Sequence, residues 1–401
     1  MKKDNLNEKL IYILNAIFFF IFLFNILGNK NLVSILFSLT FIFVLILWLK
    51  NIISNFNNID LLAIIIIVFC FISVSINLFA SNSGFNLSYF KKVTIFSFTI
   101  MYFSTAIKIS INFKNIQKLL KIMFIGISVA CIYLYYTRNN EMYIFNGRIS
   151  NYLCFNFNNP NETSIFLASL FLLGVDLFFL EKVRFIKILD LILLVFLIYF
   201  VNETRSRNAL FTLILFLVLL IYILLKKKHI KFSNFSLLFG SLWPMIFCIF
   251  YMLSIKKLKS LLYFLISEGK TVDSRYYVWK YAFNNFKSSP IFGAYNQISN
   301  GTGTSQMFNT HLDILASYGI IVFILTSYFF YQIVKNVNSR SHDIKSKIFL
   351  LSFIAVLILG MCEAALVSGG LSIHILVGDF LIIACNVLTN EQDGVKNENI
   401  Q

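Results

Sequence analysis

Long apolar runs separated by short polar stretches make up most of this 401-residue chain. About 20 consecutive apolar residues are enough for a helix to cross a bilayer, and twelve segments approach that length. They cover residues 9–27, 32–49, 60–79, 91–108, 118–137, 163–180, 186–201, 209–225, 235–254, 308–334, 346–362 and 371–388. The pattern predicts an all-α fold, in which residues 1–401 form a single polytopic bundle of about twelve transmembrane helices.

One polar interruption, residues 255–307, is much longer than the others and separates the ninth segment from the tenth. Apolar side chains recur in it near i, i+3, i+4 and i+7 from Arg275 to Phe286, which is the spacing of an amphipathic helix. We expect this helix to lie on the membrane surface with its aromatic side toward the lipid. Pro290 and Gly293 then break the helix and turn the chain.

The lysines orient the predicted bundle, because Lys and Arg collect on cytoplasmic loops. With the N-terminus inside, the cytoplasmic side takes Lys2, Lys3, Lys50 and the lysines and arginines within 108–121, 182–187, 226–231 and 335–347. Both termini are then cytoplasmic, residues 389–401 form a polar cytoplasmic tail, and residues 255–307 form an outer loop, periplasmic or extracellular.

Composition supports the membrane interpretation, since 58% hydrophobic and 13% charged residues are values that exclude a soluble globular domain. The net charge of +16 does not indicate nucleic-acid binding, because the lysines form short clusters between apolar runs and no continuous basic face. The apolar start at Leu10 has no cleavage site after it and is read as a retained first helix. The six cysteines are isolated and predict no disulfide framework.

Arginine is distributed differently from lysine. Five of the seven arginines fall on the predicted outer loops, at Arg138, Arg148, Arg205, Arg207 and Arg275. Lysine would satisfy the topology equally well, so arginine on the translocated side needs another explanation. A guanidinium fork that binds phosphate or carboxylate is one such explanation.

Two short motifs head membrane segments on this outer side. Pro160 bars helix before it, and Asn161 and Thr163 suit an N-cap, so a helix N-terminus that favours anions should open there. Arg205 and Arg207 stand in a very short connection where both can reach a phosphate. The structural alternatives are a well-capped helix and a pair of interfacial anchors with snorkelling side chains.

His311 differs from the other three histidines because it starts the tenth segment directly after the outer loop. A lone interfacial histidine is more often structural than catalytic, so its position carries the argument. The outer loops contain no HExxH, no DxD and no Cys/His ligand set, so neither a metal nor another cofactor is indicated.

In this order, the motifs resemble the Wzy-type O-antigen or capsular polysaccharide polymerases of the O-antigen ligase/polymerase superfamily. The matching residues are Asn159-Pro160-Asn161, Ser206-Arg207, Arg275 with Trp279 and Pro290 to Gly293, and His311 with Gly319, all within residues 145–335. The family commonly has Asn after this His and Gly after Ser-Arg. This chain instead has Leu312 and Asn208 there, with Asn309 two residues before the His.

The resemblance implies a metal-independent membrane glycosyltransferase that acts on undecaprenyl-diphosphate-linked oligosaccharide at the outer face of the bacterial inner membrane. A polymerase moves the growing chain from its lipid diphosphate to the non-reducing end of a new lipid-linked repeat unit, whereas a ligase delivers the finished chain to the lipid A–core of lipopolysaccharide. Besides the lipid-linked substrate and the bilayer, a chain-length-determining membrane protein is a candidate partner, and nucleic acid is not.

The residue chemistry agrees with this activity. Departure of a polyprenyl diphosphate develops negative charge, which Arg207 and Arg275 would stabilise. The acceptor hydroxyl needs a base, for which His311 is the first candidate and Asp313 is one of three reserves. The candidate substrate-binding residues, of which Glu162 and Asp273 are the other reserve bases, are Arg148, Asn161, Glu162, Arg205, Asp273 and Tyr276.

Two other classes of protein stay open at this stage. A flippase for lipid-linked oligosaccharides, or another transporter, should carry ionisable groups in mid-membrane, and Asp176 and Asp379 are the only clear candidates. A non-enzymatic membrane scaffold would leave the five outward arginines unexplained.

Overall fold

The computed structural model describes residues 5–26, 30–80, 87–109, 113–137, 144–145, 148–149, 160–226, 232–254, 271–294, 307–340, 344–368 and 376–386. Within these ranges the regular structure is helical apart from two short strands, β1 (Ile144–Phe145) and β2 (Arg148–Ile149). The strands pair antiparallel, with Phe145 opposite Arg148. The predicted all-α class is confirmed.

Each of the twelve predicted apolar segments coincides with a helix. The helices are α1 (Asn5–Ile26), α2 (Lys30–Ser54), α3 (Asn58–Ala80), α4 (Leu87–Ala106), α5 (Phe113–Thr137), α6 (Pro160–Leu180), α7 (Arg184–Glu203), α8 (Arg207–Lys226), α9 (Asn234–Ser254), α11 (Thr271–Phe286), α13 (Thr310–Arg340), α14 (Ile344–Leu359), α15 (Ala365–Ser368) and a last helix, Leu376–Asn386. In the described part of the chain, eight helices are long and apolar enough to cross a membrane, namely α2, α3, α5, α6, α7, α8, α9 and α13.

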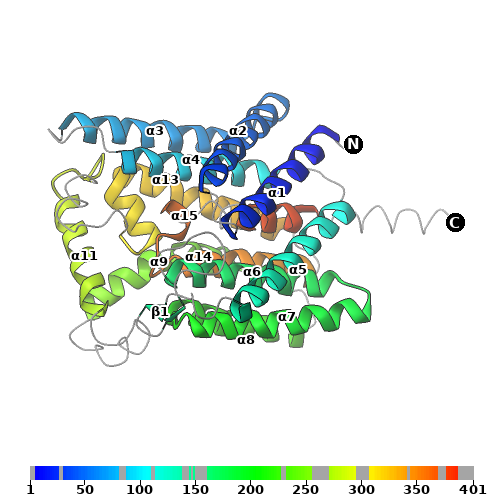
Figure 1. The fold of residues 1–401 in the computed structure, drawn as a ribbon. Helices are drawn as coiled ribbons and strands as arrows, with labels where there is room; N and C mark the ends of the chain where they lie inside the picture. Colours follow the sequence, from blue (N-terminus) through cyan, green and yellow to red (C-terminus); the bar gives the residue numbers. More distant parts are fainter. Residues whose placement is uncertain are drawn as a thin grey trace.

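Two helices, α6 and α14, form the centre of the bundle. α14 packs against α6, α8, α9 and α13, and its residues from Ser346 to Leu359 are all buried. Figure 1 shows α1 to α4 on one side of this centre and α7 and α8 on the other. The peripheral helix α7 instead exposes Phe185, Ile188 and Leu191, the outward apolar surface expected of a helix that faces lipid.

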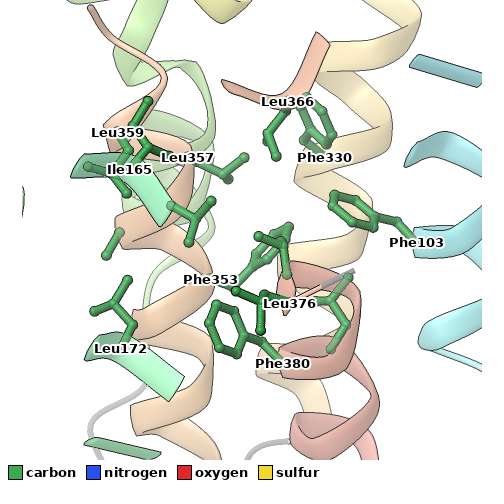
Figure 2. Close-up of a cluster of buried hydrophobic side chains, with 14 of the residues drawn as sticks. Phe103, Ile165, Leu172, Phe330, Phe353, Leu357, Leu359, Leu366, Leu376 and Phe380 are labelled. Atoms are coloured by element: carbon green, nitrogen blue, oxygen red, sulfur yellow. The ribbon is translucent and has the colours of Figure 1, made fainter. Parts of the chain in front are cut away.

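Aromatic and branched side chains from several helices fill the core around α14 (Figure 2). Phe353 of α14 meets Phe103 of α4 edge to face, with ring centroids 5.9 Å apart, and Ile165 and Leu172 belong to α6, which packs against α14. Lipid tails are as apolar as these side chains, so close packing rather than the hydrophobic effect holds such helices together.

The two ends of the bundle carry different polar groups. Near one end Lys108 bonds both carboxylate oxygens of Asp60 at 2.6 Å, and Lys121 pairs with Asp190 and lies 3.5 Å from Glu181. Glu181 directly follows α6, about 30 Å along the helix from its first residues. The lysines of this end therefore stand a membrane thickness away from the residues that begin α6.

Reporter fusions can test the predicted topology. The lysine distribution predicts that both termini and the loop at residues 226–231 face the cytoplasm while residues 255–307 face outward. In Figure 1, α11 lies at the opposite end of the bundle from the beginning of α1, as this topology requires. We expect a fusion at Lys280 to report an external position. A cytoplasmic signal there would overturn the topology and the mechanism built on it.

Candidate functional site

The short segment that follows α14, residues 360–364, is where the predicted motifs meet. The backbone N–H of Thr310, the first residue of α13, donates to the Gly360 carbonyl at 2.8 Å, and the Thr310 hydroxyl donates to the Glu363 carbonyl at 3.2 Å. A Cβ at Gly360 would stand 2.5 Å from the Thr310 Oγ1. Only glycine lets α13 begin this close to the end of α14.

Asn309 fixes the start of α13. Its side-chain oxygen accepts the backbone N–H of Leu312 at 2.9 Å, which is the geometry of an N-cap. Its amide nitrogen donates to the carbonyls of Pro244 in α9 at 2.7 Å and Met361 at 2.9 Å. The asparagine that precedes His311 in this chain thus ties three elements together.

Glu363 joins the outer loop to α6. One oxygen, Oε1, accepts the Nη2 of Arg275 at 2.7 Å and the Nδ2 of Asn161 at 2.9 Å. Burial opposes the charged form of Arg275, but the Glu363 carboxylate outweighs this and raises the pKa of the guanidinium. Arg275 also lies over the Phe308 ring, 5.7 Å from its centroid. Two residues predicted for the site are therefore brought together by a third that the sequence reasoning missed.

Asn161 was expected to suit the N-cap of its helix, and the structure corrects this. α6 already begins at Pro160, so Asn161 and Thr163 both lie inside the first turn. Proline is favoured at the first helical position because the N–H it lacks would have no partner there. Freed from capping, the Asn161 amide reaches Glu363.

The arginine motif between α7 and α8 lies beside the same segment. Asn208, in the first turn of α8, donates to the Leu359 carbonyl at the end of α14 at 2.8 Å. Arg207 begins α8 and is half-buried, whereas Arg205 is exposed with a left-handed φ of 50°. The connection is as short as predicted, and the start of α8 abuts the end of α14, from which residues 360–364 continue.

α11 confirms the predicted amphipathic helix but not its expected placement. Trp279 is fully buried, donates its indole N–H to the Met307 carbonyl at 2.7 Å and meets the Tyr251 ring of α9 edge to face. The aromatic side therefore packs on protein. An apolar stripe does not tell a protein surface from a lipid one, so the sequence pattern could not separate the two. Tyr276, on the same helix, is half-buried.

His311 lies in the first turn of α13, as predicted, and its side chain is buried. The ring meets Phe323 and Phe330 edge to face, at centroid distances of 6.0 and 6.3 Å. Neither ring nitrogen meets full hydrogen-bond geometry with a described residue, although the Ser241 backbone lies close enough to interact with the ring. The reserve base Asp313 is also buried and forms an ion pair with Lys92 of α4.

α13 is broken at Gly319, where φ is 87° and ψ −179°. The chain from Pro290 to Ala294 fills the break. The Ile320 N–H donates to the Pro290 carbonyl at 2.9 Å, and the Ala294 N–H donates to the Ala316 carbonyl at 2.8 Å. Backbone groups exposed by a broken membrane helix need such partners. The glycine and the Pro-Ile-Phe-Gly run of the resemblance thus form one contact.

Gly319→Ala is expected to prevent correct assembly of the bundle. The observed φ and ψ are essentially restricted to glycine and cost other residues about 1–3 kcal/mol. A Cβ would also stand 1.9 Å from the Ile291 carbonyl oxygen. The measurement is the yield of monodisperse protein after detergent extraction. Gly126→Ala in α5 is the matched control, because its Cβ would meet only the Phe19 ring at 3.2 Å. Equal yields of the two variants would show that the backbone of residues 290–294 can move aside to accommodate a side chain at position 319.

Three site candidates are described by their backbone alone. Arg148 in β2, Glu162 in α6 and Asp273 in α11 have described backbone positions, but their side chains lie outside the described part of the structure. The tail at residues 389–401 lies outside it as well, as do residues 255–270 and 295–306 of the outer loop.

The cysteine and metal chemistry of the site is limited. Five cysteines are buried, and Cys154 lies outside the described residues. Cys362 adjoins Glu363 and is buried. In the described part of the chain no group of three or more His, Cys, Asp or Glu could hold a metal ion.

Comparison with known proteins bears on the same region. Residues 192–327 match the family model described as O-antigen ligase, an interval that runs from α7 through α11 into α13 and includes Arg207, Arg275 and His311. No curated protein matches the chain significantly. The family match covers about a third of the chain and supports the O-antigen ligase/polymerase superfamily, whose members are glycosyltransferase-like membrane enzymes, without distinguishing polymerase from ligase.

Proposed function

We propose that this protein is a polysaccharide repeat-unit polymerase. It transfers a growing O-antigen or capsular glycan from undecaprenyl diphosphate to the non-reducing end of a lipid-linked repeat unit, at the outer face of the bacterial inner membrane and without a metal ion. The observation that supports this most is the meeting of Arg275 and Asn161 at Glu363. Two residues that the resemblance assigns to the site, 114 positions apart, share one carboxylate oxygen.

The proposed reaction is a single displacement. The acceptor hydroxyl oxygen attacks the anomeric carbon of the growing chain, the bond from that carbon to the diphosphate oxygen breaks, and the hydroxyl proton passes to His311. Arg207 and Arg275 stabilise the negative charge that develops on the departing diphosphate. Arg148, Arg205, Asn161, Glu162, Asp273 and Tyr276 are proposed to bind the substrate around this centre.

A ligase is the second candidate, because the matching family model carries that description. The donor, the leaving diphosphate and the residues that act on them would be the same. Only the acceptor differs, a lipid A–core in place of a lipid-linked repeat unit.

The transporter interpretation finds less support among the described residues. Asp176 accepts the Ser352 hydroxyl at 2.9 Å, and Asp379 accepts the Tyr102 hydroxyl at 2.9 Å. Both carboxyl groups are fully buried between packed helices. Such contacts join helices, whereas a transport pathway needs ionisable groups that line a cavity.

Purified protein with a synthetic lipid-linked repeat unit distinguishes these functions. A ladder of longer lipid-linked glycans, formed without any other acceptor, would establish the polymerase. A product that appears only when lipid A–core is added would establish the ligase instead. Absence of any new glycosidic bond with either acceptor would refute both.

A further inference from the structure

Glu363 binds residues of the candidate site but has no role in the reaction proposed above. Its side chain is only 4% exposed, and the Arg275 side chain that it binds is 12% exposed. The same carboxylate oxygen holds Asn161, and the backbone carbonyl of Glu363 holds Thr310. One residue thus ties α11, α6 and α13 to the segment after α14.

In the substrate-free protein, Arg275 already has a negatively charged partner, the Glu363 carboxylate. A guanidinium fork suits a carboxylate and a phosphate equally well, since both offer paired oxygens. An unpaired guanidinium would be costly at this depth, because a buried charge without a partner loses its hydration. An empty diphosphate site built on Arg275 therefore needs a counter-anion, and a diphosphate brings its own.

We propose that Glu363 is a positioning residue that holds Arg275 and Asn161 in place in the empty site, and that the diphosphate of the lipid-linked substrate displaces its carboxylate from Arg275. This inference rests on the proposed function for the identity of the anion. Glu363 retains Asn161 during the exchange, so α6 stays aligned while the guanidinium turns to the diphosphate. When the diphosphate leaves, the carboxylate re-forms the pair and helps to release the product.

Stability alone is a weaker account of this ion pair. Buried pairs contribute little net stability compared with apolar residues of similar size, because desolvation offsets their attraction. A proton-accepting role for Glu363 is also disfavoured. A carboxylate that accepts hydrogen bonds from a guanidinium and an amide is stabilised in its ionised form.

The test measures pyrophosphate binding to the purified full-length protein by calorimetry, for wild type and Glu363→Gln. Glutamine keeps the oxygen that accepts from Asn161 but removes the competing charge. We expect pyrophosphate affinity to rise by about 10-fold, the scale of one charge-assisted hydrogen bond. In polymerisation assays the KM for the lipid-linked substrate should fall, and kcat should fall with it because the diphosphate leaves more slowly.

If the ion pair between Glu363 and Arg275 is purely structural, Glu363→Gln should not increase pyrophosphate affinity. Loss of docking would then weaken pyrophosphate binding or leave it unchanged, and either result overturns the inference.

Asp190→Asn, which neutralises the partner of Lys121 at the other end of the bundle, is the matched control and should leave pyrophosphate affinity at the wild-type value. A wild type that binds pyrophosphate but forms no glycosidic bond would refute the proposed function and leave the anion exchange standing. A wild type that polymerises, with no tightening in Glu363→Gln, would refute the exchange alone.

Discussion

Arg275→Ala is expected to abolish long-chain polysaccharide while the protein remains in the membrane. In the proposed mechanism this guanidinium stabilises the charge that develops on the departing diphosphate, and removal of one such donor costs roughly 100-fold to 1,000-fold in rate. Arg207→Ala should act in the same way. Lysine at either position should restore activity only in part, because a point charge replaces a two-pronged donor. The measurement is glycan chain length in cells that carry each variant as their sole copy.

Two controls separate catalysis from assembly. Arg275→Ala leaves the buried Glu363 carboxylate without its guanidinium, which by itself can destabilise a protein by about 3–5 kcal/mol. The double variant Arg275→Ala/Glu363→Gln removes the carboxylate charge as well and should recover protein amount without recovering polymer. Arg184→Ala, an exposed arginine at the start of α7, should give full-length polymer. Full-length polymer from both Arg275→Ala and Arg207→Ala would reduce these residues to interface anchors.

The positions of the helices along the chain could be predicted because a membrane imposes a length on every apolar run. Each predicted segment became a helix, including the eleven-residue Leu376–Asn386 around Asp379. The kink in α13 was not predictable in the same way. An isolated glycine in a helical pattern is usually tolerated, and only contact with residues 290–294 shows that Gly319 breaks the helix.

The sequence allowed the cationic and amide residues of the site to be predicted, but not the carboxylate that binds them. The arginines were identified because lysine would have satisfied topology, and Asn161 because of its proline neighbour. Their partner Glu363 lies 88 residues from Arg275 and 202 from Asn161, and pairing across such separations leaves no periodic signal in one sequence. One clue was available. Glu363 is an acidic residue on a predicted outer connection, at the end of an apolar run and opposite arginines that needed counter-charges.

The buried ion pair between Lys92 and Asp313 was missed for a related reason. Lys92 opens an apolar run, where a lysine normally marks the helix end at the interface. In the structure it lies inside the bundle, where it also donates to the Ser317 hydroxyl at 3.1 Å. Tyr89, one turn earlier in α4, donates to the Ser317 carbonyl at 2.6 Å. These contacts hold the first part of α13, which carries His311, independently of the part beyond Gly319.

His311→Leu is expected to leave the protein folded and to lower turnover by roughly 100-fold to 10,000-fold. Leucine is the informative substitution because of where the ring lies. The ring is buried between Phe323 and Phe330, and its nitrogens interact only weakly with the protein: the Ser241 backbone lies near, but neither nitrogen meets full hydrogen-bond geometry with a described residue. A buried polar group without a well-formed hydrogen bond contributes little to stability, so an apolar side chain of similar size should replace it at a small cost. The variant therefore removes the proton acceptor at little cost to packing.

A structural role and a base role for His311 give opposite results in the same assay. If the ring only fills space, His311→Leu polymerises lipid-linked repeat units at the wild-type rate, and only His311→Ala loses protein through the cavity it leaves. If the ring is the base, leucine, alanine and asparagine variants all fail at matched protein amount, since none of these side chains, the asparagine amide included, can take the hydroxyl proton.

Wild-type activity rises with pH as a base becomes deprotonated, and the residual activity of the variants should lack that acidic limb. The buried ring of the substrate-free protein does not count against this role, because catalytic hydrogen bonds often form only once substrate is bound. Wild-type rates from His311→Leu would end the base assignment and direct the search to Glu162 and Asp273.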